Sequence, residues 1–313
     1  MIEVSHLTKK YGSHYAVQDL SFTLEKGKVY GLLGPNGAGK STTMNMITGY
    51  IGPTSGEIRI DGHSMLEEAQ EAKKQIGYLP EIPPLYPDMT VYEYLLSVAE
   101  LKKIKSREKA SAVEGAMAAV EITDMKSRLI RNLSKGYRQR TGIAQALIGN
   151  PKVIILDEPT VGLDPRQIQD IRELVKSLGT DHTVILSSHI LSEISAVCDD
   201  VLIINKGKLI ARQSAGDLDR MALGQRELEL VAEGTKEKLK ETLLSLPAVI
   251  KAEFLPAETP PQYRIRLSLQ DSADIRREIF FALADASCPI LEFYPVNRSL
   301  EEIFLELTGE ETL

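Results

Sequence analysis

The chain has 313 residues and a net charge of -7, and its hydrophobic fraction of 43% and charged fraction of 26% are those of a globular protein. The length predicts about two domains with enough apolar residues for buried cores. The negative charge argues against a nucleic-acid binder. No segment reaches the roughly 18 apolar residues of a membrane-spanning helix, and the first residues lack the pattern of a secretory signal. We therefore expect a cytoplasmic protein without nucleic-acid partners.

The first part of the chain alternates strand-like apolar runs with helical stretches, which predicts an α/β domain. Residues 2–4, 20–24 and 56–60 indicate a small antiparallel β layer at its beginning. Residues 29–33 form an apolar run that leads into a glycine-rich loop. A buried parallel strand that enters a phosphate site has this pattern.

The middle of this domain combines helices with further strands. Residues 91–131 are rich in Ala, Glu, Lys and Leu, which predicts a helical subdomain inserted into the α/β fold. Residues 153–156 and 183–186 predict core strands, each followed by polar residues, and residues 201–211 predict a hairpin. We therefore expect a sheet whose strand ends carry polar side chains.

The pattern changes after about residue 215, where strands and helices follow in the order βαββαβ and one amphipathic helix closes the series. Strands are predicted at residues 227–231, 249–254, 263–269 and 290–294, and helices at residues 236–246, 274–283 and 299–307. We predict an α/β domain at residues 1–215 and a small α+β domain at residues 216–313, consistent with a ferredoxin-like sandwich. Because the second domain has no recognisable catalytic constellation, we interpret it as an accessory domain for regulation or dimerisation.

A phosphate-binding loop follows residues 29–33. It consists of Gly34, Pro35, Asn36, Gly37, Ala38, Gly39, Lys40 and Ser41, which fit GxxxxGK(S/T) at every fixed position. Glycines let backbone N–H groups converge on phosphate oxygens, and the helix predicted after the loop adds the positive end of its dipole. Lys40 is predicted to bridge the β- and γ-phosphates, and the Ser41 hydroxyl to ligate Mg²⁺. The matching context disfavours the alternative, a glycine-rich turn with an unrelated lysine.

Polar side chains also follow two of the predicted core strands. Asp157 and Glu158 come directly after residues 153–156, at the sheet edge where ligands of open α/β sheets bind. Asp157 is predicted to hold Mg²⁺ through its water shell, and Glu158 to polarise an attacking water. A lone histidine after a strand is usually structural, but the spacing of His189 from the other motifs indicates a γ-phosphate contact.

A second anion site is predicted at Ser134 and Gly136, at the start of a helix that continues to about residue 150. A hydroxyl and free backbone N–H groups at a helix N-terminus attract anions. Because the chain already has a complete phosphate loop, a second such site makes sense if it serves the nucleotide held by another subunit.

Together these motifs resemble those of ATP-binding cassette (ABC) transporter subunits over residues 2–215. The family's Walker A loop matches residues 34–41, its signature residues 133–140, its Walker B strand residues 153–158, its D-loop residues 161–164 and its switch histidine His189. The resemblance implies a P-loop ATPase that forms a head-to-tail dimer, with ATP between Walker A of one chain and the signature of the other. Residues of the nucleotide site implied by the resemblance are Tyr11, stacked on adenine, together with Thr42, Gln139 and Asp164.

The resemblance also implies that ATP binding and hydrolysis power a separate membrane permease, which docks near residues 80–100. The protein would then be peripheral on the inner face of the cell membrane. The C-terminal region resembles the tails of bacterial ATPases that serve drug-export, polysaccharide-export and gliding-type exporters, which favours export. The partner cassette is either a second copy or a related cassette.

The chain departs from the family at Glu81, where members usually carry glutamine. A carboxylate binds Mg²⁺ more strongly than an amide does, so Glu81 is predicted as a metal ligand with Ser41 and Asp157. One interpretation is a tolerated variation within an exporter subgroup. The other is a changed coupling between metal binding and the membrane partner.

Other functions fit the sequence less well. A soluble ABC ATPase that acts on a partner other than a transporter is the main alternative, but ribosome-acting members usually carry two cassettes, and DNA-repair members carry a long coiled coil. A P-loop kinase or GTPase has no use for the motif at residues 133–140. A non-catalytic scaffold would have no reason to retain Glu158.

Overall fold

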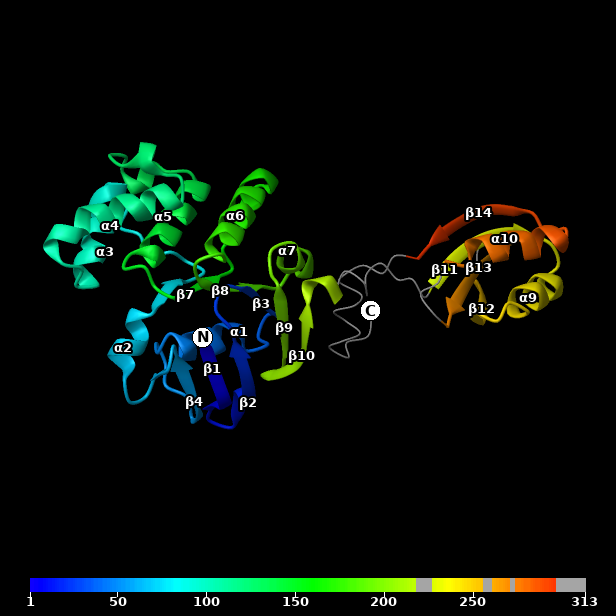
Figure 1. The fold of residues 1–313 in the computed structure, drawn as a ribbon, viewed down its shortest axis with the longest axis horizontal. Coiled ribbons are helices and arrows are strands. Elements are labelled where there is room, and N and C mark those ends of the chain that lie inside the picture. The colour runs from blue at the N-terminus through cyan, green and yellow to red at the C-terminus, as the bar shows by residue number, and fades with distance from the viewer. Residues whose placement is uncertain (218–226, 256–260, 271–273, 297–313) are drawn as a thin grey trace. The chain divides into compact units, whose positions relative to one another are not determined.

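The computed structural model describes residues 1–217, 227–255, 261–270 and 274–296. The chain divides into two compact units, Met1–Ala215 and Gly216–Leu313 (Figure 1). The described part of the first unit contains two sheets and a group of helices, and that of the second contains one sheet with helices.

An antiparallel layer opens the first unit. It contains β1 (Ile2–Tyr11), β2 (His14–Leu24), β4 (Ser55–Ile60) and β5 (His63–Ser64), in the order β2-β1-β4-β5. β1 and β2 are longer than the sequence predicts. Register shifts interrupt their pairing on both sides of Leu7, and His6 and Asp19 adopt positive φ angles of 52°. Because bulges break the alternation of buried and exposed residues, the sequence pattern reveals only part of each strand.

The second sheet of this unit has six strands. They are β3 (Val29–Leu33), β6 (Ile76–Leu79), β7 (Val153–Asp157), β8 (Thr183–Ser188), β9 (Asp200–Asn205) and β10 (Lys208–Ser214). Their order is β10-β9-β3-β8-β7-β6, and all neighbours are parallel except β9 and β10, which form the predicted hairpin. Every residue of β3, β7 and β8 is buried, as is typical of central strands in a parallel sheet. Since β8 lies between β3 and β7, the carboxyl ends of the three strands meet at one edge.

A hydrophobic core between the two sheets also holds α1 (Lys40–Ile47). Met44 and Met46 of α1 pack there with Ile58 of β4 and Ile155 of β7. Burying one side chain of this size contributes roughly 1.5–3 kcal/mol. This packing fixes α1, and with it the loop that joins α1 to β3.

The other helices of the first unit lie mainly in the middle of the chain. They are α2 (Ala69–Lys74), α3 (Val91–Leu101), α4 (Ser106–Ala119), α5 (Lys135–Leu147), α6 (Pro165–Leu178) and α7 (Leu191–Ser195), with the 3₁₀ helices η1 (Thr123–Met125) and η2 (Ile130–Asn132). α3, α4 and α5 lie together as the predicted helical subdomain (Figure 1). α3 begins at a capping box, in which Thr90 Oγ1 accepts a hydrogen bond from the Glu93 amide and the Glu93 carboxylate accepts one from the Thr90 amide.

The second unit contains an antiparallel sheet and two long helices within its described residues. Its elements are β11 (Glu227–Glu233), α9 (Lys236–Leu244), β12 (Val249–Leu255), β13 (Gln262–Leu269), α10 (Arg276–Asp285) and β14 (Ile290–Pro295). The strand order β12-β13-β11-β14 and the βαββαβ sequence give the predicted ferredoxin-like sandwich. Leu239 of α9 and Ile279 of α10 share one core with Leu230 and Ile265 of the sheet. The helix predicted at residues 299–307 lies outside the described residues.

Candidate functional site

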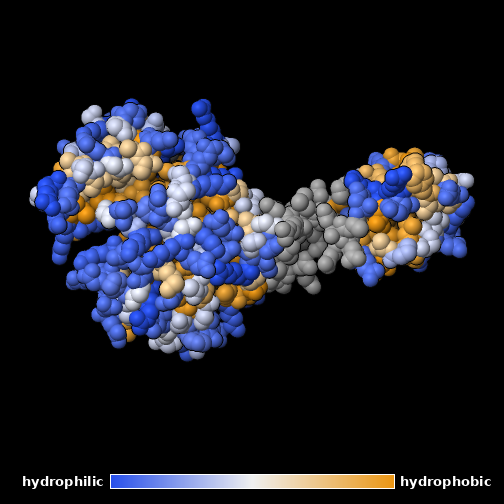
Figure 2. All heavy atoms as spheres, viewed as in Figure 1, coloured by the Kyte–Doolittle hydropathy of each residue, from blue (hydrophilic) through white to orange (hydrophobic). Residues whose placement is uncertain are grey.

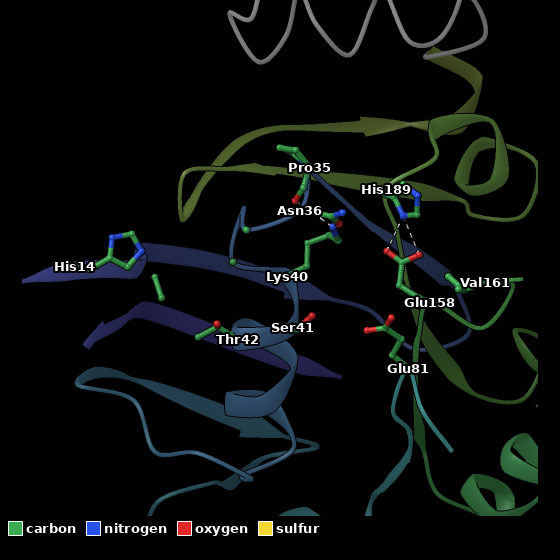
Figure 3. A pocket seen from close by; sticks show the side chains of 13 residues that line it. His14, Pro35, Asn36, Lys40, Ser41, Thr42, Glu81, Glu158, Val161 and His189 are labelled. Carbon is green, nitrogen blue, oxygen red and sulfur yellow. Dashed lines mark hydrogen bonds and ion pairs between the residues drawn. The ribbon is translucent and has the colours of Figure 1, made fainter. Parts of the chain in front are cut away.

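A cavity of about 410 Å³ lies at the carboxyl edge of the six-stranded sheet (Figure 3). Small-molecule sites typically measure roughly 300–1,000 Å³. The lining residues are His14, Ala16, Pro35, Asn36, Gly37, Gly39, Lys40, Ser41, Thr42, Glu81, Glu158, Val161 and His189. The fold therefore brings the predicted phosphate loop together with three groups that follow other strands, Glu81, Glu158 and His189.

The loop between β3 and α1 has a backbone that requires glycine. Gly39 precedes α1 with φ 106°, a conformation that other residues rarely adopt. A Cβ atom on Gly34 would lie 2.2 Å from the carbonyl oxygen of Ile204. Thr43 Oγ1 donates a hydrogen bond of 2.9 Å to the Gly39 carbonyl oxygen, which ties the loop to the first turn of α1. The loop is thus held in place around one side of the cavity.

Lys40 is the buried cation of this cavity. Its Nζ donates hydrogen bonds to the carbonyl oxygens of Gly34 at 2.6 Å and Pro35 at 3.2 Å. Burial lowers the pKa of Lys40 from its usual value, and neighbouring carboxylates, led by Glu158, oppose this shift. A phosphate that entered the cavity could take over these hydrogen bonds.

Asp157 ends β7 and is almost fully buried beside the cavity. Ser187 of β8 donates a hydrogen bond of 2.6 Å from its Oγ to Asp157 Oδ1. Burial raises the pKa of Asp157 above its usual value, and the hydrogen bond from Ser187 opposes this rise. A nearby cation would favour the ionised carboxylate, so the position suits a metal ligand.

Glu158 and His189 face each other at one end of the cavity (Figure 3). His189 Nδ1 lies 3.1 Å from each carboxylate oxygen of Glu158. The Glu158 side chain is only 11% exposed, and its backbone has a positive φ of 48°. The carboxylate is thus directed into the cavity by an unusual backbone conformation and by an imidazole contact.

Glu81 follows β6, which pairs with β7. This pairing brings Glu81 to the same sheet edge as Glu158, and both carboxylates line the cavity. In Figure 3, Glu81 and His189 lie on opposite sides of Glu158. The residue at which the chain departs from the family pattern is therefore a cavity residue.

The predicted signature residues lie elsewhere. Ser134 caps the N-terminus of α5, where its side chain accepts a hydrogen bond of 3.3 Å from the Tyr137 amide. Gly136 and Gln139 lie in the first turns of α5, and Gln139 is buried. Among the described residues around the cavity, none belongs to α5. Within one chain, the structure does not bring the signature to the phosphate loop.

The other end of α5 is held by Lys102 at the end of α3. Its Nζ donates hydrogen bonds to the carbonyl oxygens of Gln145, Ala146 and Ile148 at 3.3, 3.1 and 2.7 Å. Burial lowers the pKa of Lys102 to about 8. These bonds satisfy carbonyls that the helix leaves unpaired at its C-terminus, and they join α5 to the end of α3.

The cavity lining also excludes Tyr11, Asp164 and two residues of the predicted loop, Gly34 and Ala38. Tyr11 is 52% exposed, and Asp164 caps the N-terminus of α6. The structure instead adds His14 and Ala16, which the sequence did not single out, and Val161, the first residue of the predicted D-loop. His14 pairs with Tyr11 across the β1–β2 hairpin, so the turn geometry decides which side chain reaches the cavity.

Known proteins resemble this chain over nearly its whole length. The model of the ABC transporter family matches residues 17–161. The Bacillus subtilis ABC transporter ATP-binding protein YhcH, itself uncharacterised, is 36% identical over 99% of this chain and 96% of its own length. The chain belongs to the ABC transporter family. It is an ATP-binding subunit of that family and an ATPase, which confirms the class predicted from the motifs.

Two other relatives extend over both units of this ABC ATPase. The linearmycin resistance ATP-binding protein LnrL of Bacillus subtilis is 33% identical over 99% of the chain and 98% of its own length. The Nod factor export ATP-binding protein I of Cupriavidus metallidurans is 30% identical over 99% of the chain and 98% of its own length. The second unit therefore has counterparts in these relatives.

Solved structures resemble the ABC ATPase over about the length of its first unit. An ATP-binding subunit of an ABC transporter is 30% identical with a TM-score of 0.63, covering 71% of this chain and 92% of its own. A dimeric ATP-binding cassette in a post-hydrolysis state with ADP and phosphate is 26% identical with a TM-score of 0.61. The match covers 69% of this chain and 99% of that cassette. These likenesses confirm the P-loop cassette fold.

The ABC ATPase was predicted to lack a membrane span. Across the residues that the structure describes, no helix has both the length and the apolar character needed to cross a bilayer.

Proposed function

We propose that this ABC ATPase powers a separate transmembrane permease, and that the transporter works in export. Two relatives that match both units support export, because one is named for Nod factor export and the other for linearmycin resistance. The alternative is an ABC ATPase that acts on a partner other than a transporter. The observation that carries the proposal is the cavity in which Lys40, Glu158 and His189 converge, since it has the parts needed to bind and cleave a nucleotide.

ATP is the proposed substrate of this cavity, with its phosphates on the loop before α1. Lys40 would exchange its two backbone carbonyls for phosphate oxygens. Glu158 would orient the attacking water and accept its proton while the bond between the γ-phosphorus and the bridging oxygen breaks. His189, 3.1 Å from Glu158, would hold that carboxylate and contact the γ-phosphate. His14, at the opposite end of the cavity in Figure 3, would lie toward the base or ribose.

Mg²⁺ is the proposed metal because the oxygen groups at the cavity suit a hard cation. Ser41 and Glu81 line the cavity, and Asp157 is a buried carboxylate whose ionised form a cation would favour. These three residues would hold the ion together with phosphate oxygens and water. When bound, the ion neutralises charge on the phosphates.

A second chain is proposed to complete each site. Ser134 at the N-terminus of α5 offers an anion site, yet α5 contributes nothing to the cavity lining of its own chain. A head-to-tail pair would let the signature of one chain cover the nucleotide on the other. The resemblance to a dimeric cassette with ADP and phosphate supports this arrangement. The second chain would be a copy of this one or a related cassette.

The permease is proposed to dock near residues 80–100, where the helical subdomain begins. Three large apolar side chains in or near it are strongly exposed, with Ile82 82%, Leu101 77% and Tyr86 57% accessible. Hydrophobic residues gather over this part of the first unit on the face seen in Figure 2. A chain bound in this way would lie in the cytoplasm, on the inner face of the membrane.

Co-expression with a polytopic membrane protein encoded beside this chain tests the proposal. The two should copurify from detergent-solubilised membranes, and inside-out vesicles carrying them should accumulate the cargo only with Mg-ATP. An active ATPase that remains in the soluble fraction and couples to no transport would favour the non-transport alternative.

Replacing Glu81 by Gln should weaken Mg²⁺ binding without abolishing activity. The carboxylate lines the cavity, and an amide is a weaker ligand for Mg²⁺. We expect the Mg²⁺ concentration for half-maximal ATPase activity to rise several-fold, on the order of 1 kcal/mol in binding free energy. A Mg²⁺ titration of ATPase rate measures it, and an unchanged midpoint would remove Glu81 from the metal site.

The second unit is proposed as an accessory domain for regulation or dimerisation. Its described residues have their own core, and every cavity residue lies in the first unit. A chain that ends at Ala215 should therefore bind ATP within about twofold of the parent affinity, because the removed part is a separate compact unit. Calorimetric titration with ATP checks this. A folded truncated chain that fails to bind ATP would show that the second unit serves the site.

A further inference from the structure

The carboxyl end of β8 carries a hydroxyl that joins two of the proposed site residues. Ser187 is fully buried, and β8 lies between β3 and β7. Its Oγ donates a hydrogen bond of 2.6 Å to Asp157 Oδ1 and accepts one of 2.9 Å from the Glu158 amide. The hydroxyl therefore donates to the last residue of β7, Asp157, and accepts from the residue that follows it, Glu158.

The second of these bonds acts on an unusual backbone. Glu158 has a φ of 48°, in the left-handed region that non-glycine residues rarely occupy because it strains the backbone. Such a conformation persists when its surroundings hold it. The Ser187 Oγ lies at the amide of this residue, so it fixes the peptide that sets the direction of the Glu158 side chain. Contact with His189 then holds the carboxylate itself.

We infer that Ser187 is a positioning residue for ATP hydrolysis, which keeps the Glu158 backbone turned so that its carboxylate points at the attacking water. The inference rests on the proposed role of Glu158. Ser187 lines no part of the cavity and acts through Asp157 and Glu158. Its loss should therefore affect the chemical step more than nucleotide binding.

The same strand provides a matched control. Thr183, at the other end of β8, is also buried, and its Oγ1 donates a hydrogen bond of 3.2 Å to the Glu25 carbonyl oxygen. Replacing Thr183 by Val removes one buried hydroxyl from β8 without touching the cavity. Four residues of extended strand, roughly 13 Å, separate the two positions. If Ser187 had a purely structural role, replacing Ser187 and replacing Thr183 would have equivalent effects on kcat and on stability.

The experiment compares Ser187→Ala, Ser187→Cys and Thr183→Val in the full chain. Cysteine keeps the size of the side chain but is a weak donor and acceptor. We expect kcat to fall at least about tenfold in both Ser187 variants, because a small displacement of a catalytic group is costly in rate. The dissociation constant for ATP should stay within about threefold, since Ser187 does not line the cavity. Thr183→Val should keep kcat within about twofold of the parent value, while it lowers the melting temperature about as much as the Ser187 variants do.

Two results would overturn the inference. One is a kcat in the Ser187 variants equal to that of Thr183→Val. The other is a loss that appears entirely in ATP affinity. A Glu158→Gln chain measured alongside distinguishes a failure of the proposed role of Glu158 from a failure of the inferred role of Ser187. If that chain remains active, the proposed role of Glu158 fails; if it is inactive while Ser187→Ala is normal, only the inference about Ser187 fails.

Discussion

Replacing Glu158 by Gln should lower kcat for ATP hydrolysis by at least about 100-fold, the lower end of what a general base contributes. Glutamine keeps the shape of the side chain, but its amide cannot accept the proton of the attacking water. ATP affinity should change little, because the Lys40 and Ser41 side of the cavity stays intact. Release of phosphate and binding of ATP, measured on the same preparation, test both parts of this prediction.

The control for this variant is Glu237→Gln, which makes the same change on α9 of the second unit, at a residue that does not line the cavity. It should hydrolyse ATP at the parent rate. A Glu158→Gln chain within about tenfold of the parent kcat would assign the water-activating role to another group.

Replacing Lys40 by Ala should abolish tight ATP binding, whereas the Glu158 variant keeps ATP binding and loses kcat. Lys40 is the buried cation of the cavity, and its Nζ donates hydrogen bonds to the carbonyl oxygens of Gly34 and Pro35. A hydrogen bond to a charged group is worth about 1.5–3 kcal/mol, so ATP affinity should fall by roughly 10- to 100-fold or more. Isothermal titration with ATP measures the loss.

Lys40→Met serves as the control for this change, because it keeps most of the buried volume while it removes the charged hydrogen-bond donor. It should lose ATP affinity as Lys40→Ala does, while its melting temperature stays nearer that of the parent. Parent-like ATP binding in both variants would contradict the proposed contact between Lys40 and the phosphates.

The sequence predicted the parts of the site that depend on local spacing. The loop from Gly34 to Ser41 needs particular residues at fixed positions between a strand and a helix, so its pattern is visible without a fold. Glu158 and His189 were also predicted, because each follows an apolar strand. Their direct contact at 3.1 Å depends on the strand order, which places β7 beside β8.

Other features leave no signal in the sequence. Thr183, Ser187 and Ser188 are all buried hydroxyl residues of one strand, and only the neighbouring strand shows which of them touches Asp157. In the antiparallel layer, bulges hid the full length of β1 and β2. His14 reaches the cavity because of the hairpin turn beside it, a geometry that no residue pattern specified.

The central proposal is that two chains share the nucleotide sites, with Ser134 of one facing the phosphate loop of the other. The most direct measurement is the mass of the Glu158→Gln chain by light scattering with saturating Mg-ATP. We predict twice the 34.6 kDa of one chain, and a single-chain mass when Ser134→Arg is added to block the second anion site. A Glu158→Gln chain that binds ATP but keeps the mass of one chain would contradict the shared site.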